Sequence, residues 1–308
     1  MTEFGYTAGG YFVKTTEKYD SVTNIWTSKT DLNVARDGLA GFSLNGYGYA
    51  VGGGTTGALN TTEKYNYASN TWAIKNILNT ARYDLVGFSL NGYGYTVSGF
   101  DTGYSIVTEK YDDSVDIWTP KANVNTGRDY GTGFSLNGYG YIIGGYTGIE
   151  SKSTEKYDDV ANSWTPKANI NAGKDGLAGF SLKGYGYAIG GTTGLRSKTT
   201  EKYDDVANSW TPKADMNTAR AYLSGFTANN YGYTAGGYTG ISSNINEKYD
   251  DVANSWTPKG TLNTARSYLT GFALDEVSTT ITSGRSSFSS RGATVSGGIS
   301  AGKGKRRR

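Results

Sequence analysis

The chain contains no cysteine and no histidine among its 308 residues, and only four prolines. Without cysteine there is no disulfide framework, and nothing indicates a redox compartment. The two absences together also remove the usual catalytic nucleophile, the usual general base and most ligands for transition metals. We therefore expect no metal, no cofactor and no enzymatic activity.

Long apolar runs are missing as well. No stretch approaches the roughly 20 apolar residues that a membrane-spanning helix needs, and the opening MTEFGYTAGG lacks the basic start and apolar core of a signal peptide. Charge is spread unevenly. Residues 277–308 hold seven lysines and arginines and no acid, so the net charge of +3 leaves −4 for residues 1–276. We expect a mildly acidic body and a basic C-terminal tail.

The most prominent feature of the chain is a repeat. Its tryptophans recur every 46 residues, at Trp26, Trp72, Trp118, Trp164, Trp210 and Trp256. A strict repeat of this length indicates stacked supersecondary units. In one copy, turn signals separate four expected strands: residues 176–182, 185–191, 200–203 and a short strand around Trp210. Four antiparallel strands in each repeat are typical of a β-propeller blade.

The two ends of the repeat array complement each other. The chain starts in a second strand, FGYTAGG, and the missing first strand appears at residues 269–274. Pairing of this segment with residues 4–10 closes the ring and removes exposed sheet edges. The predicted fold class is all-β: a six-bladed β-propeller of four-stranded antiparallel blades over residues 1–276. A Ser/Gly-rich basic tail over residues 277–308 follows it.

Three further elements recur at fixed offsets from the tryptophans: a glycine pair, a Tyr-Asp pair in the third strand and an arginine before the first strand. They are Gly9-Gly10, Gly52-Gly53, Gly144-Gly145, Gly190-Gly191 and Gly236-Gly237; Tyr157-Asp158, Tyr203-Asp204 and Tyr249-Asp250; and Arg36, Arg82, Arg128, Arg220 and Arg266. In these elements residues 1 to about 275 resemble the kelch repeat family. Departures from the pattern are Ser98, Lys174 and Asn66.

The kelch resemblance implies a propeller that binds partners. The competing WD40 propellers need a Gly-His element, which a chain without histidine cannot supply. The kelch-like copper oxidases depend on histidine ligands and a Tyr–Cys link, so their chemistry is excluded here.

Inner strands of a blade are covered by neighbouring blades on both sides, so large residues must face small ones. Tyr185, Tyr187 and Ile189 share one face of a strand, with Gly186 and Ala188 on the other. We predict that the tyrosine-bearing face nests against the Gly/Ala face of the next blade. Because every blade has a tryptophan, we interpret these residues as core anchors rather than stacking sites for sugars or bases.

The copies differ most in the loops between second and third strands, which we expect to share a face with the fourth-to-first connections. Loops on a rigid scaffold commonly carry binding, so this face is the predicted site for a partner protein, a glycan or a host receptor. The candidates are Phe12, Tyr83, Phe100, Tyr104, Tyr130, Tyr146, Glu150, Arg196, Tyr222, Tyr238 and Tyr268. Drift of unconstrained loops after duplication is the alternative interpretation.

The recurrent acids have a structural interpretation. A glutamate with lysine beside it recurs in every third strand, which favours inter-strand charge pairing over catalysis. Pairs such as Asp158-Asp159 precede Val-Ala-Asn, which indicates a plain turn rather than a calcium site.

The tail carries Lys303, Lys305, Arg306, Arg307 and Arg308. Such a segment suits contact with an acidic groove on a protein or an anionic lipid surface, and weakly with nucleic acid. A solubilising or cloning-derived end is the alternative interpretation. We expect it to tether the ring in a larger assembly.

The predicted function is a non-catalytic structural or binding module. Little-diverged repeats rich in Tyr, Asn, Thr and Gly resemble in style a virion component such as a bacteriophage tail, fibre or decoration protein. The alternatives are a cytoplasmic kelch-like interaction scaffold, a carbohydrate-binding lectin and a sugar-modifying kelch-like enzyme such as an epimerase.

Overall fold

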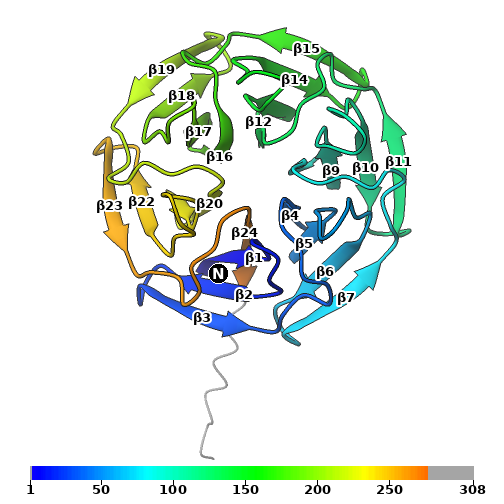
Figure 1. The fold of residues 1–308 in the computed structure, drawn as a ribbon, viewed down its shortest axis with the longest axis horizontal. Helices are drawn as coiled ribbons and strands as arrows, with labels where there is room; N and C mark the ends of the chain where they lie inside the picture. The colour runs from blue at the N-terminus through cyan, green and yellow to red at the C-terminus, as the bar shows by residue number, and fades with distance from the viewer. Residues whose placement is uncertain (1, 277–308) are drawn as a thin grey trace, which may run out of the picture. The chain divides into compact units, whose positions relative to one another are not determined.

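The computed structural model describes residues 2–276, which form six four-stranded antiparallel sheets around a central axis (Figure 1). Blade 1 consists of β24 (Thr270–Glu276), β1 (Thr2–Ala8), β2 (Thr16–Asp20) and β3 (Ile25–Lys29). Blade 2 consists of β4 (Ala40–Leu44), β5 (Tyr47–Val51), β6 (Thr62–Asn66) and β7 (Thr71–Lys75). Blade 3 consists of β8 (Val86–Leu90), β9 (Tyr93–Val97), β10 (Thr108–Asp112) and β11 (Ile117–Lys121).

The other three blades repeat this order, with the first strand at the axis and the fourth at the outer wall (Figure 1). Blade 4 consists of β12 (Thr132–Leu136), β13 (Tyr139–Ile143), β14 (Thr154–Asp158) and β15 (Ser163–Lys167). Blade 5 consists of β16 (Asp175–Leu182), β17 (Tyr185–Thr192), β18 (Thr200–Asp204) and β19 (Ser209–Lys213). Blade 6 consists of β20 (Ser224–Ala228), β21 (Tyr231–Ala235), β22 (Asn246–Asp250) and β23 (Ser255–Lys259). Over this part of the chain, no helix has the length and apolar character to cross a membrane.

The ring is closed by its two ends, as predicted. β24 pairs antiparallel with β1, with Tyr6 opposite Phe272 and Thr2 opposite Glu276. The rings of Tyr6 and Phe272 stack, with 5.4 Å between their centroids. The pairing gives blade 1 the same four-stranded order as the other blades, with β24 at the axis, so the predicted six-bladed all-β architecture is confirmed.

Adjacent blades pack large residues against small ones. A Cβ added to Gly140 in β13 would overlap the ring of Phe88, which β8 of the preceding blade inserts there. The same phenylalanine–glycine contact recurs at the other five blade interfaces. The predicted nesting is therefore confirmed, with the first-strand phenylalanine as the large partner of the glycine.

The tryptophans join neighbouring blades. Trp164 on β15 is buried, and its indole N–H lies within hydrogen-bond distance of Thr108 Oγ1 at 3.2 Å and Ala122 O at 3.0 Å, both in blade 3. Five of the six tryptophans are buried and Trp210 is partly buried. Their interpretation as core anchors is confirmed.

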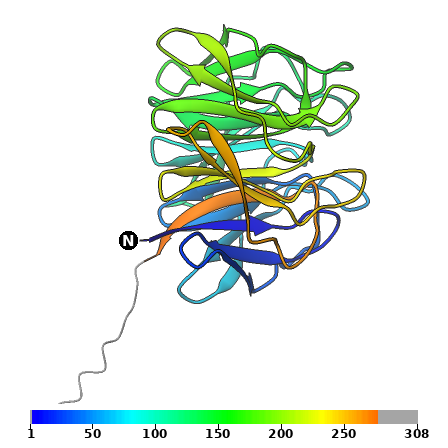
Figure 2. The ribbon, with the colours of Figure 1, turned by 90° about the vertical axis from the view of Figure 1, so that its left-hand side faces the viewer.

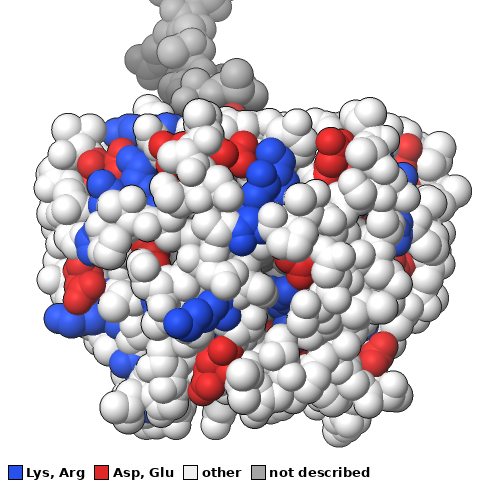
Figure 3. Space-filling view, turned by 90° about the horizontal axis from the view of Figure 1, so that it is seen from above, with Lys and Arg blue, Asp and Glu red and all other residues white. Residues whose placement is uncertain are grey.

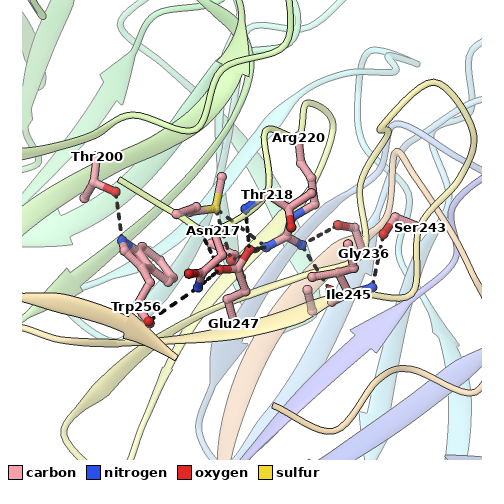
Figure 4. A network of polar contacts seen from close by, with 12 residues as sticks. Thr200, Asn217, Thr218, Arg220, Gly236, Ser243, Ile245, Glu247 and Trp256 are labelled. Atoms are coloured by element: carbon pink, nitrogen blue, oxygen red, sulfur yellow. Dashed lines mark hydrogen bonds and ion pairs between the residues drawn. The ribbon is translucent and has the colours of Figure 1, made fainter. Parts of the chain in front are cut away.

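The repeated glutamates pair with the repeated arginines, not with the lysines beside them. Figure 4 shows the arrangement in blade 6, where Arg220 Nη2 lies 3.1 Å from Glu247 Oε1. The second carboxylate oxygen accepts hydrogen bonds from the backbone and side-chain N–H groups of Asn217 at 2.8 and 2.6 Å. In blade 5, Lys174 takes the arginine's place and lies 3.0 Å from Glu201. The predicted charge pairing of the glutamates is found, but the partner comes from the chain before a first strand rather than from a neighbouring strand.

Four of those lysines pair with the second aspartate of an Asp-Asp turn in the neighbouring blade, and Lys18 pairs with Glu276. Lys110 lies 2.9 Å from Asp159 Oδ2 and 3.6 Å over the ring of Tyr93. The first aspartate, Asp158, accepts hydrogen bonds from the backbone N–H groups of residues 160 and 161. Both carboxylates thus have structural partners. Figure 3 shows charges of both signs side by side on the outer wall of the ring, among many uncharged residues.

Candidate functional site

The two faces of the ring differ. The tight turns between first and second strands lie at one face, where β24 ends at Glu276 (Figure 2). The loops between second and third strands and the fourth-to-first connections lie at the other, which we call the loop face. Along the axis lie cavities of about 80, 120 and 250 Å³, lined by the six first strands and the residues just before them.

A circle of backbone hydrogen bonds surrounds the axis at the loop face. It joins six residues at equivalent positions in the repeat, one from each blade, which we call the mouth ring: Gly38, Asp84, Tyr130, Gly176, Tyr222 and Tyr268. Each N–H donates to the carbonyl of the member 46 residues earlier, and Gly38 donates to Tyr268, at N···O distances of 2.6–3.1 Å. All six have positive φ, between 51 and 60°. Four of them are not glycine, so the circle holds side chains in a backbone conformation that L residues rarely adopt.

The three tyrosines of the mouth ring form one aromatic cluster. Tyr222 and Tyr268 stack at 4.2 Å between ring centroids, and Tyr130 meets Tyr222 at 5.1 Å. Burial raises the pKa of Tyr130 far above its usual range, and the neighbouring carboxyl group of Asp84 raises it further. The aromatic cluster is thereby tied to an acidic neighbour.

Four aspartates gather around this cluster. Asp84 belongs to the mouth ring. In three other blades the residue just before the mouth-ring position is an aspartate: Asp37, Asp129 and Asp175. Burial raises the pKa of each of these three to about 6. The pKa of Asp84 is also raised well above its ordinary value, by burial first and then by repulsion from the other three carboxylates.

The four carboxylates lack counter-charges. Within residues 2–276, no lysine or arginine forms an ion pair with any of them. Asp129 and Asp175 are only 6% and 7% exposed, and the Oδ1 atom of each is buried without a hydrogen-bond partner. The mouth is thus an unneutralised acidic region at the end of the axis.

A pocket opens beside the mouth ring because one loop is short. In blade 1 the second-to-third loop spans residues 9–15, against residues 52–61 in blade 2, so it is three residues shorter. Loops of the other blades fold back on themselves, as in the bridge between Gly54 and Ala58. The resulting hollow, which we call the mouth pocket, has a volume of about 440 Å³. It is lined by Tyr11, Phe12, Asp37, Gly54, Thr55, Thr56, Gly57, Tyr83, Asp84, Tyr130 and Tyr268.

The structure brings several sequence candidates together here. The mouth pocket is lined by the candidates Phe12, Tyr83, Tyr130 and Tyr268. Tyr222 stacks against Tyr268. Tyr11 and Phe12 are exposed at 61% and 55%, and both have positive φ.

Other candidates lie farther out on the loop face. Phe100, Tyr104 and Tyr146 form a chain of ring contacts at 5.7 and 5.9 Å that starts from Tyr83. Glu150 pairs with Tyr146 in a β-bridge.

A separate pair is formed by Arg196 and Tyr238, whose guanidinium and ring are 5.6 Å apart. The tail candidates at positions 303 and 305–308 lie outside the described residues.

Sequence reasoning missed Tyr11 and the four aspartates. A signal for the aspartates was present, since the two positions after each repeat arginine or lysine read DG, YD, DY, DG, AY and SY in otherwise similar copies. Only the tyrosines were singled out there. Among the described residues, no three acidic side chains are grouped as metal ligands.

Comparisons with known proteins agree with this architecture. Residues 132–171 and 181–217 match the model of the kelch motif, which confirms the resemblance over these segments. A solved structure titled "Structure of YjhT" superposes with a TM-score of 0.69, covering 82% of this chain and 93% of that one. Its sequence identity is 17%, so the likeness concerns the fold alone. No curated protein matches the sequence.

Proposed function

Since the chain is a six-bladed β-propeller with kelch motifs, we propose that it is a non-catalytic binding module whose binding site is the mouth of the loop face. One observation carries this proposal. The repeats are nearly uniform, yet the six equivalent mouth positions hold glycine, aspartate or tyrosine in an irregular order. The backbone circle keeps these positions equivalent, so only the side chains distinguish them, as in a scaffold that presents one site.

The chemistry of the mouth favours binding over catalysis. Its titratable groups are aspartates and tyrosines, and the buried carboxyl group of Asp84 interacts with Tyr130. Pockets that bind a ligand commonly combine aromatic walls with a few convergent polar groups, which is the composition found here.

We further propose that the module works in a virion, such as a bacteriophage tail, fibre or decoration. Residues 277–308 would attach it and leave the mouth free. The support is the basic tail and the little-diverged repeats. Sedimentation of virions with the full chain and with a chain ending at Glu276 tests this. Retention of the shortened chain at full occupancy would remove the tethering role.

A carbohydrate-binding lectin is the second candidate. Stacked tyrosines beside carboxylates are groups that sugars contact through ring faces and hydroxyls, and Tyr222 and Tyr268 supply such a stack. The cytoplasmic interaction scaffold differs from the virion protein in its assembly, not in the use of the mouth.

The binding proposal is tested by comparing Tyr130→Ala combined with Tyr268→Ala against Tyr238→Ala, on the same face outside the pocket. A neutral glycan array and a set of charged peptides serve as probes. We expect at least one probe to bind the unaltered chain and the control, and to be lost from the double variant. If no probe distinguishes the two variants, the mouth is not the binding site.

A further inference from the structure

We infer that the mouth pocket binds a cationic side chain, a lysine or arginine of a protein segment seated on the loop face. This rests on the proposed function and specifies its ligand. Three features of the described residues support it: the missing counter-charge, the aromatic walls and the shape of the pocket.

The mouth lacks the counter-charge that every repeated glutamate of residues 2–276 has. The buried glutamates of the repeat are each neutralised, as when Arg82 lies 3.0 Å from Glu109. By contrast, Asp37 and Asp84 line the mouth pocket with no lysine or arginine among the other lining residues. Asp129 and Asp175 do not line the pocket, but they are more than nine-tenths buried, hold an unpartnered oxygen and repel the carboxylate of Asp84. A buried carboxylate without a partner is costly. A cation entering the pocket would meet Asp37 and Asp84, which line it, and would supply the counter-charge that they lack.

The same protein shows how such a cation is held. At the blade interfaces a lysine lies over a tyrosine ring and against an aspartate, as Lys64 does 3.8 Å over Tyr47 and 2.8 Å from Asp113. The mouth pocket offers tyrosine rings and aspartates but contains no lysine or arginine among its lining residues. Cations bind favourably over aromatic faces, and more so where water is excluded. The pocket therefore supplies the tyrosine rings and the aspartates of this arrangement, and a bound cation would complete it.

The shape of the pocket selects an organic cation carried by a chain. Its volume of about 440 Å³ exceeds the needs of a bare ion. No three acids of residues 2–276 converge as metal ligands. The short loop of blade 1 leaves one side open past the exposed Tyr11 and Phe12, which gives an extended segment a path across the rim. Anionic sugars would meet repulsion from the four aspartates.

Binding of a fluorescein-labelled tetra-arginine peptide to the full-length protein, followed by anisotropy at about 0.15 M salt, tests the inference. The matched probe is tetra-citrulline, which keeps the shape and removes the charge. We expect tetra-arginine to bind at least about tenfold more tightly. Equal binding of the two probes would overturn the inference without requiring any variant to fold.

Variants then locate the site. Asp37→Asn combined with Asp84→Asn should weaken tetra-arginine binding at least about tenfold. The matched control, Asp215→Asn, removes an exposed acid that contacts Lys198 outside the pocket and should leave binding unchanged. Equal loss in the control, or no loss in the double variant, would contradict a site at the mouth.

A third arm identifies the source of the cation. A peptide of residues 300–308 is compared with a permuted peptide of equal charge. Preference for the first supports docking of another copy's basic segment, and equal binding supports a separate basic partner. If no cationic probe binds but a neutral glycan binds and is lost from the tyrosine double variant, the cation inference fails while the proposed function stands. If binding of neither the cationic probes nor the glycans depends on the mouth residues, the cation inference and the proposed function both fail.

Discussion

Replacing Asp129 by asparagine should make the protein more stable at neutral pH, although the residue is almost fully buried. Its Oδ1 atom has no hydrogen-bond partner, and burial raises the pKa of its carboxyl group to about 6 from an ordinary value of 3.8. The folded state therefore holds the proton more tightly than the unfolded state. Asparagine keeps the shape of the side chain and removes the charge that burial disfavours.

The expected gain follows from this difference. One pKa unit corresponds to about 1.4 kcal/mol, so the free energy of unfolding should rise by ~1–3 kcal/mol in the variant at pH 8. Because the folded-state pKa is raised, the penalty in the unaltered protein is absent below about pH 4. It grows as pH rises and is complete above about pH 6. The advantage of the variant should follow the same course.

Urea denaturation at pH 4, 6 and 8, followed by tryptophan fluorescence, measures the effect. The control is Asp215→Asn, which is exposed and should change the free energy of unfolding by less than about 0.5 kcal/mol. If Asp129→Asn lowers stability at pH 8, the carboxylate is neutralised by a partner and the reasoning about the mouth is refuted.

Three further changes probe the scaffold. Gly140→Ala would press a Cβ into Phe88 and should lower the free energy of unfolding in denaturant by ~1–3 kcal/mol. Gly103→Ala, in open space, should leave the free energy of unfolding almost unchanged, and equal effects of the two variants would contradict the nested packing. Arg82→Ala strands a buried glutamate and should cost ~3–5 kcal/mol, while Arg82→Lys should cost less because blade 5 uses lysine there; similar losses would argue against the ion pair. A chain lacking everything from Thr270 onward should lose its cooperative thermal transition, whereas a chain ending at Glu276 should keep it; identical melting curves would refute closure by β24.

Stability and binding are opposed at the mouth. The scaffold neutralises its buried charges with recurring partners, as Arg220 does for Glu247. At the axis it instead gathers aspartates that destabilise the folded state and that a cationic ligand would stabilise. The variant that gains stability at Asp129 should therefore also bind basic peptides more weakly, which links the two measurements.

Much of the fold could be predicted from the chain alone because its determinants are local and repeated. A tryptophan every 46 residues, glycine pairs and hairpin turns define a four-stranded unit, and the displaced first strand indicates how the ring closes. The alternation of large and small residues, as in Tyr187 beside Gly186, predicts the packing of one blade on the next.

The candidate site depends on contacts that the chain alone does not reveal. Each mouth-ring residue meets a partner 46 positions away, and only the closed ring brings Asp84 within reach of Asp129 and Asp175. The partner of each repeated glutamate, and the pocket beside the shortened loop of blade 1, likewise arise where different blades converge. Local residue patterns determine the blade because its hydrogen bonds join neighbouring strands. The tertiary structure decides the site because burial and electrostatic repulsion depend on distances in space.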